Sequence, residues 1–136
     1  MCLRCFILLL FLAPVSLICR GQNRKHYDVL IHEFLADPSP SVGLPASSFI
    51  ELKNVSGSAF NLRNWKISNG NTTADFKKDY FLASDSFLII CPASAEAAYR
   101  AFGSAVGLTG FPSLNHDAGE IILSADDGTV IHAIQY

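Results

Sequence analysis

Short apolar segments alternate with clusters of turn-forming residues through most of the chain. In Phe49–Asn54 the charged Glu51 and Lys53 alternate with two aliphatic residues, which is the period-two pattern of a strand with one buried face. Ile50 and Leu52 therefore face the predicted core, while the two charged side chains share the opposite face. The segment predicts a half-buried strand that ends in a turn at its asparagine.

The same pattern predicts further strands, which are separated by Pro, Gly, Asn and Asp. They are Asp28–Ala36, Asn61–Ser68, Thr72–Phe76, Tyr80–Leu82, Phe87–Cys91, Glu120–Ala125 and Thr129–Gln135. The single tryptophan, Trp65, and Ile67 point to one side of their strand, toward the core. Short strands at regular spacing with little helix indicate an all-β protein, an antiparallel sandwich or a small barrel.

One short helix is predicted among these strands. Ser94 is a suitable N-cap for Ala95–Phe102, which is rich in alanine, and Gly103 ends the segment. Ala98 and Phe102 are four residues apart, so they would lie on one side of the helix.

Residues 1–21 have the form of a secretory signal peptide, with Arg4 before an apolar run that contains Pro14. A membrane-spanning helix needs roughly 20 apolar residues, so an uncleaved anchor is the weaker alternative. Cleavage after Cys19 or after Gly21 fits the sequence; the second would leave Gln22 as the new N-terminus and 22–27 as a linker, and lipidation of Cys19 is a further alternative. We expect a secreted or surface-held protein that meets the membrane only through its leader or a lipid anchor.

The exported part has an acidic charge balance and a single thiol. From Gln22 onward, eight Lys and Arg stand against twelve Asp and Glu, a formal charge of −4. Because phosphate neutralisation needs clustered cations, nucleic acid is not an expected partner. The one cysteine of this part, Cys91, cannot form an internal disulfide and ends the apolar run that begins at Phe87. We expect a buried, unreactive thiol.

Several segments together resemble a known family. They are FIELKN, NLRNW, KISNG, FLASDSFLIIC and FPSLNHDAGEIILSADDGTVIHAIQY, in this order. In this order they resemble the lamin tail domain, which nuclear lamins share with many exported bacterial proteins. The resemblance implies an immunoglobulin-like antiparallel β-sandwich over residues 28–136. The leader favours an exported bacterial version of the family. The sequence departs from the family pattern in the loop Asn115–Glu120, which is slightly longer.

Three carboxylates are candidate ligands of a metal ion. Glu33, Asp37 and Glu51 would converge if the first two long strands are neighbours, and hard oxygen ligands suit Ca²⁺. No Asp-x-Asp-x-Asp-Gly loop is present, and His32 and His132 stand singly in strands. We therefore expect no required cofactor, with Ca²⁺ as the alternative.

Four apolar residues stand in an otherwise polar loop near the end of the chain: Leu108, Phe111, Pro112 and Leu114. Together with the loop Pro38–Ser47 they are candidates for a binding surface, because sandwiches present end loops on a rigid frame. The alternative is that they fold back as a lid over one end of the sandwich.

The sequence predicts no catalytic site. No Gly-x-Ser-x-Gly elbow is present, and His116-Asp117 is an isolated dipeptide. We expect a non-catalytic exported module for adhesion, attachment or substrate targeting, accessory to a larger extracellular protein. Its partner would be a protein or a surface polysaccharide. The alternative is a calcium- or carbohydrate-dependent binding module of a secreted hydrolase.

Overall fold

The computed structural model describes residues 22–136. The predicted signal peptide, with Cys19, lies outside this range. Among the described residues, no helix has the length and apolar character that crossing a membrane requires. The strands are β1 (Val29–Leu35), β2 (Phe49–Asn54), β3 (Phe60–Asn61), β4 (Lys66–Ser68), β5 (Thr73–Asp75), β6 (Phe81–Leu82), β7 (Phe87–Pro92), β8 (Ala105–Leu108), β9 (Glu120–Ser124) and β10 (Val130–Gln135).

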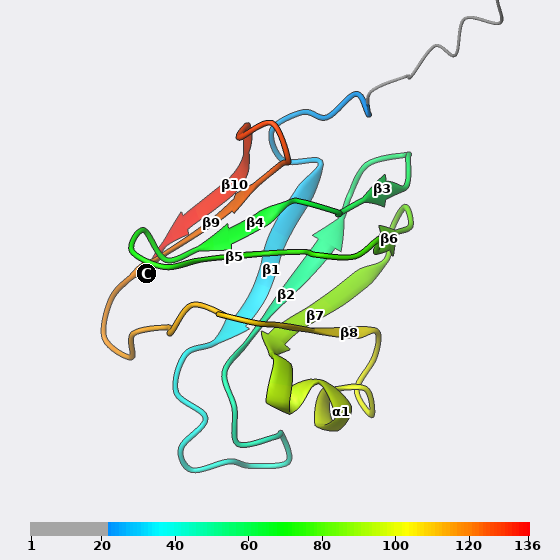
Figure 1. Cartoon of the computed structure of the whole chain (residues 1–136). Helices are drawn as coiled ribbons and strands as arrows, with labels where there is room; N and C mark the ends of the chain where they lie inside the picture. The colour runs from blue at the N-terminus through cyan, green and yellow to red at the C-terminus, as the bar shows by residue number, and fades with distance from the viewer. Residues whose placement is uncertain (1–21) are drawn as a thin grey trace, which may run out of the picture.

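Two four-stranded sheets form the two layers of a β-sandwich (Figure 1). One sheet has the order β1-β2-β7-β8, the other has the order β10-β9-β4-β5, and β3 pairs with β6 at one end. The predicted hairpin is confirmed, since β9 and β10 pair in antiparallel fashion around a turn with Gly128 at φ +86°. The all-β immunoglobulin-like sandwich predicted from the sequence is therefore confirmed.

One pair of strands departs from the antiparallel pattern. β8 is parallel to β7, with Ile90 opposite Val106. A parallel pair requires a crossover connection, and residues 93–104 supply it through the 3₁₀ turn Ala93–Ala95 and the helix α1 (Glu96–Tyr99). The sequence analysis predicted no strand at Ala105–Leu108, because four residues with a central glycine carry little strand signal.

The helix is shorter than predicted and buries a different face. Ser94 lies within the 3₁₀ turn, and the N-cap position of α1 is Ala95, which makes no side-chain capping bond. Ala95 and Tyr99 are buried, whereas Phe102 is half exposed. The predicted Ser94 cap and the apolar side through Phe102 are wrong, because the single turn is oriented by its packing against β7 and β8.

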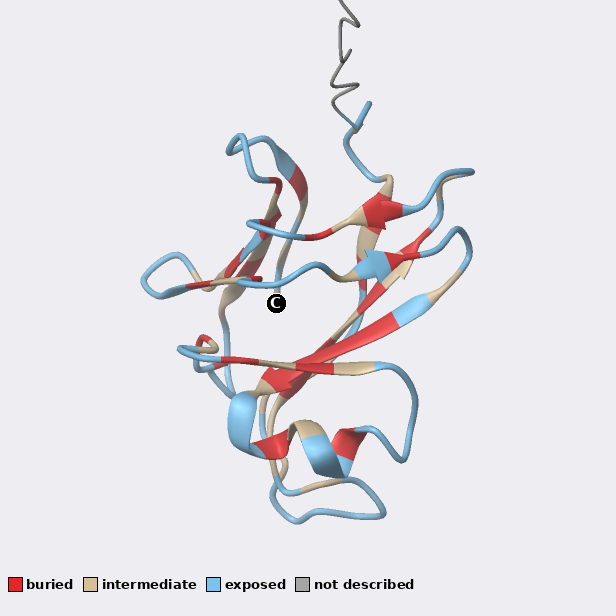
Figure 2. Ribbon diagram, turned by 45° about the vertical axis from the view of Figure 1, so that its right-hand side comes forward, coloured by how far each residue is buried: buried red, intermediate tan, exposed pale blue. Residues whose placement is uncertain are grey.

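The main core lies between the two sheets, and the buried segments of their strands face one another (Figure 2). Trp65 is completely buried and packs against Phe60, with 5.7 Å between the ring centroids. Asn54 is the buried polar residue of this region, and its side chain is fully bonded. Its amide donates to the carbonyls of Ser58 and Leu82, and its oxygen accepts from the backbone and hydroxyl of Ser56.

A second, smaller apolar cluster covers part of the outer face of the first sheet. Its buried members are Phe49, Ile89, Cys91, Ala95 and Tyr99. The Tyr99 hydroxyl donates to the carbonyl of Ser47, which ties α1 to the long loop between β1 and β2. The α1 end of this face is thus closed, and the end that carries Glu51 and Lys53 stays open to solvent.

The segment 22–27, predicted to be a linker, is held against the sandwich. The guanidinium of Arg24 forms ion pairs with Asp126 and Asp127 in the β9–β10 turn. The backbone N–H of Tyr27 donates to the carbonyl of Ile131 at 2.8 Å. These contacts extend the folded unit to the start of the described residues.

Candidate functional site

The structure brings together two of the three carboxylates that were predicted to bind a metal. Glu33 of β1 is the direct cross-strand partner of Glu51 of β2. Ile31 is opposite Leu52, so His32 is an extra residue on β1 and forms a β-bulge. A bulge of this kind turns both of its residues toward the face of the opposing residue, here Glu51.

His32 completes this group of side chains, which we call the bulge cluster: His32, Glu33 and Glu51. The Nδ1 atom of His32 lies 3.0 Å from Oε1 of Glu51. One donor atom from each of the three residues lies within 4.8 Å of the others. Both glutamates were predicted from the sequence, whereas His32 was taken as a single strand residue, because a β-bulge leaves no mark in the alternation of apolar and polar residues.

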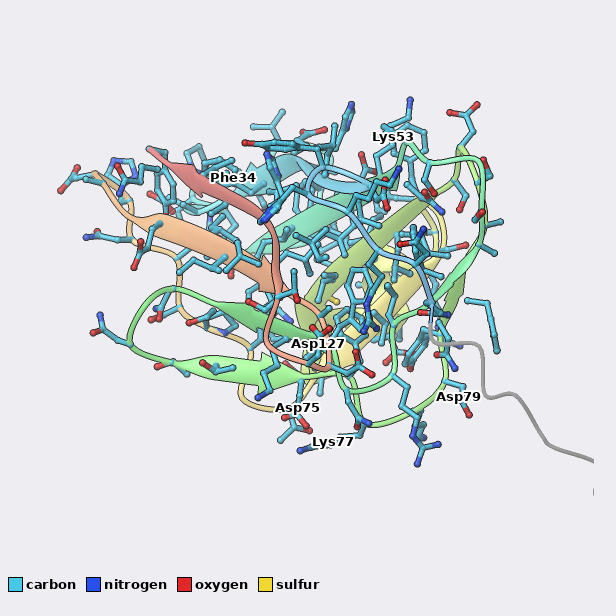
Figure 3. All side chains as sticks on the ribbon, turned by 90° about the horizontal axis from the view of Figure 1, so that it is seen from above. Phe34, Lys53, Asp75, Lys77, Asp79 and Asp127 are labelled. Carbon is cyan, nitrogen blue, oxygen red and sulfur yellow. The ribbon has the colours of Figure 1, made fainter. Side chains whose placement is uncertain are left out.

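The neighbours of the bulge cluster orient its imidazole. The ring of Phe87 on β7 meets the His32 ring edge to face, with 5.1 Å between the centroids. Lys53 of β2 contacts other groups: its Nζ lies 3.5 Å from Oδ1 of Asp85 and 4.8 Å from the Phe87 ring centroid. Figure 3 shows Lys53 on the outer side of this sheet, with Asp75 and Lys77 on the opposite side of the molecule.

Asp37, the third predicted ligand, lies elsewhere. Its Oδ1 atom accepts a hydrogen bond from the backbone of Ser39 at 2.8 Å, and its Oδ2 atom lies 3.5 Å from Nδ1 of His116. This arrangement is that of a turn residue at the start of the β1–β2 loop. Glu33 and Glu51 therefore meet His32 and not Asp37.

The four apolar residues of the candidate binding loop are covered. Leu108 is 4% exposed and Leu114 is 9% exposed, and both belong to the main core. Pro112 is also buried, and Phe111 is partly buried and packs against the same core. Their placement agrees with the lid alternative, and of the four only Phe111 keeps part of its side chain at the surface.

The structure has a groove beside α1 that the sequence did not predict. It consists of two adjoining cavities of about 560 and 370 Å³ that share Tyr80 and Arg100; both reach the edge strand β8, and the smaller one also reaches the edge strand β5. We call it the edge groove. One end is lined by Phe81 and Leu88, and the other by Asp75, Lys77, Lys78, Glu96 and residues 106–109.

The edge groove combines exposed aromatic surface with bonded charges. Phe81 is 74% exposed. Arg100 is paired with Glu96, whose Oε2 accepts the backbone N–H of Gly107 at 2.9 Å. That backbone hydrogen bond is the main reason that the pKa of Glu96 is lowered. Burial, followed by the charge of Glu96, raises the pKa of Tyr80.

Glu96 also limits how the groove can be used. The N–H of Gly107 points away from β7 and would otherwise be free to pair with an incoming strand, but it is bonded to Glu96. A side chain cannot be added at position 107, because its Cβ would lie 2.6 Å from the Cα of Ala93. At Gly107 the edge of β8 is therefore closed to an incoming strand.

The buried titratable groups are structural. Burial, followed by the charge of Glu96, raises the pKa of Cys91 to about 11, so its thiol is protonated and a poor nucleophile. His132 is partly buried between β10 and β1, where its Nδ1 accepts a hydrogen bond from the backbone of Ile31 at 2.8 Å. Burial lowers the pKa of His132, which keeps the ring neutral as that bond requires.

Comparison with known proteins identifies one family. The family model described as Lamin Tail Domain matches residues 22–136, which is most of the chain and all of its described part. No curated protein matches the chain. The match includes the segment 22–27 that Arg24 ties to the β9–β10 turn.

Proposed function

Because the chain belongs to the lamin tail domain family, a family of non-enzymatic immunoglobulin-like domains, we propose that it is an exported, non-catalytic interaction module. It would attach a larger extracellular protein to a protein partner. The leader-like sequence of residues 1–21 supports export, and with it the bacterial, secreted or surface-held version of the family.

One observation carries this proposal: the edge groove places an exposed phenylalanine beside an arginine. Phe81 and Arg100 line the same hollow, together with the partly buried Tyr80. Aromatic residues and arginine are enriched at the centres of protein interfaces, where they supply most of the binding energy. Phe81 is 74% exposed, so its ring is available for contact with a partner.

The rim of the groove favours a protein over a bare apolar ligand. Lys77 is paired with Asp75 and Arg100 with Glu96, so both signs of charge surround the aromatic surface. Lys78 adds a further exposed cation on the same rim. Such a mixed polar rim around an apolar centre is typical of protein interfaces.

A binding assay with matched variants tests the proposal. The domain is labelled and applied to intact cells of the source organism, with and without prior protease treatment of the cells. We expect protease-sensitive binding that is weakened at least about tenfold in Phe81→Ser and Arg100→Ala, the scale of an interface hot spot. Val42→Ser is the control, because Val42 is 84% exposed but lies in the β1–β2 loop.

Two results would overturn this reading. Binding that survives protease and disappears when surface polysaccharide is removed would assign the groove to a carbohydrate. Binding that Phe81→Ser and Val42→Ser reduce equally, or not at all, would place the interaction outside the edge groove.

A further inference from the structure

We propose that the bulge cluster of His32, Glu33 and Glu51 is a binding site for a divalent transition-metal ion, with Zn²⁺ as the representative ion. The cluster lies on the outer face of the β1-β2-β7-β8 sheet and shares no residue with the edge groove. This proposal is therefore independent of the proposed function.

The first argument is the chemistry of the three donors. An imidazole nitrogen and two carboxylates lie within 4.8 Å of one another. Imidazole suits Zn²⁺, Cu²⁺ and Ni²⁺, whereas Ca²⁺ takes six to eight oxygen ligands. Zinc is commonly four-coordinate, and three protein ligands can leave one position open for a water molecule.

The second argument is the charge balance around the two glutamates. Glu33 and Glu51 are direct cross-strand partners, and like charges in that position destabilise a sheet. Among residues 22–136, neither glutamate forms an ion pair with a lysine or arginine, and the single ion-pair partner of Glu51 is His32. A bound dication would remove this repulsion.

The lysine that shares the face of Glu51 is engaged by other groups. Lys53 is two residues from Glu51 on the same face of β2, so it could have neutralised the pair. Its ammonium instead contacts Asp85 and the ring of Phe87. The same Phe87 ring packs against His32, so one aromatic side chain contacts both the lysine ammonium and the imidazole.

The β-bulge explains how the strand pair builds such a site. Without the extra residue, His32 and Glu33 would alternate between the two faces of the sheet, and only one of them could face Glu51. The bulge places both opposite Glu51, at a point where the sheet is open to solvent. The side chains of His32 and Glu51 are 46% and 21% exposed, so an ion can reach their donor atoms.

The test uses residues 22–136 without an affinity tag of histidines. This part contains the whole family match and both apolar clusters, and it lacks the leader cysteines, which would bind zinc themselves. ZnCl₂ is titrated by calorimetry, and thermal unfolding is recorded with ZnCl₂, CaCl₂ or EDTA. We expect one zinc ion per chain and a higher melting temperature with zinc than with EDTA or calcium.

Variants locate the ion. His32→Ala, Glu33→Gln and Glu51→Gln should each weaken zinc binding at least about tenfold, since loss of even an outer-shell partner costs that much. His116→Ala is the matched control, because His116 is exposed and lies near Asp37 and Asp117. Circular dichroism of each variant without metal shows whether it is folded, and Glu33→Gln keeps the volume of the side chain.

The proposal is overturned by any of three results. They are the absence of saturable zinc binding, zinc binding that His116→Ala weakens as much as His32→Ala does, and calcium binding that matches zinc binding and does not depend on His32. The last result would restore the calcium site that the sequence alone suggested for Glu33 and Glu51.

Discussion

The backbone N–H of Ile31 donates a hydrogen bond to Nδ1 of His132 at 2.8 Å, so a side chain takes the place of a backbone carbonyl where β1 meets β10. The His132 ring also contacts the ring of Tyr27, whose own N–H donates to the carbonyl of Ile131. The bond thus closes the side of the sandwich opposite the edge groove, between the outer strands of the two sheets.

Replacing this acceptor should destabilise the fold. His132→Ala leaves the N–H of Ile31 without its partner in a partly buried place, which costs about 1–3 kcal/mol of unfolding free energy. Urea unfolding followed by circular dichroism measures the change. His26→Ala is the control and should change stability by less than about 0.5 kcal/mol, because His26 is exposed. Equal effects of the two variants would refute the role of the bond.

The stability of the domain should fall in mild acid through the same histidine. Burial lowers the pKa of His132 in the folded state below its ordinary value of 6.5. The unfolded chain then binds a proton more readily, so this contribution to stability is complete above pH 6.5 and is lost as the pH falls toward the folded-state pKa. Urea unfolding at several pH values from 7.5 downward measures the unfolding free energy as a function of pH. This free energy should fall less steeply with falling pH in His132→Gln than in the wild-type chain. An unchanged slope would show that other groups cause the effect.

The core tryptophan should contribute more than any surface residue. Trp65 is completely buried between the sheets, so Trp65→Ala should cost about 3–5 kcal/mol of unfolding free energy. Chemical denaturation of both proteins gives the difference. A cost of less than about 1 kcal/mol would show that the ring lies at the surface in solution.

Replacing the buried Asn54 should destabilise the domain about as much as replacing an apolar core residue. Asn54→Ala leaves the carbonyls of Ser58 and Leu82 and the N–H of Ser56 without their partner, and each unpaired buried group costs about 1–3 kcal/mol. We expect a total loss of at least about 2 kcal/mol, measured by urea unfolding. Asn71→Ala, at an exposed turn position, is the control. A loss no larger than that of the control would contradict the network.

The thiol of Cys91 should not react with thiol reagents while the protein is folded. Its pKa of about 11 leaves roughly one molecule in a thousand as thiolate at pH 8. In a form that begins at Gln22, Cys91 is the sole cysteine. Ellman's reagent should label it only after the protein has been unfolded. Addition of guanidinium should then give one equivalent at once. Rapid labelling without denaturant would show that the cover formed by α1 opens readily.

Alternation and turn residues determined most strands of this protein. The pattern of Phe49–Asn54, the single tryptophan and the turn before Thr129 each predicted an element that the structure contains. These signals are local, because side chains of a strand alternate between its faces whatever the strand is paired with. They were sufficient for an all-β sandwich or small barrel and for placing Glu51 on an outer face, while the immunoglobulin-like form followed from the resemblance to the lamin tail domain.

Tertiary pairing decided the features on which both proposals depend. The bulge at His32 exists because Ile31 and Glu33 pair with adjacent residues of β2, and register with a distant strand leaves no trace in local alternation. The edge groove arises where β5 and β8 end their sheets, and β8 became a strand only by pairing in parallel with β7. The sequence by itself determined which residues are apolar or charged and where the chain turns; the packing of distant strands decided which of them meet.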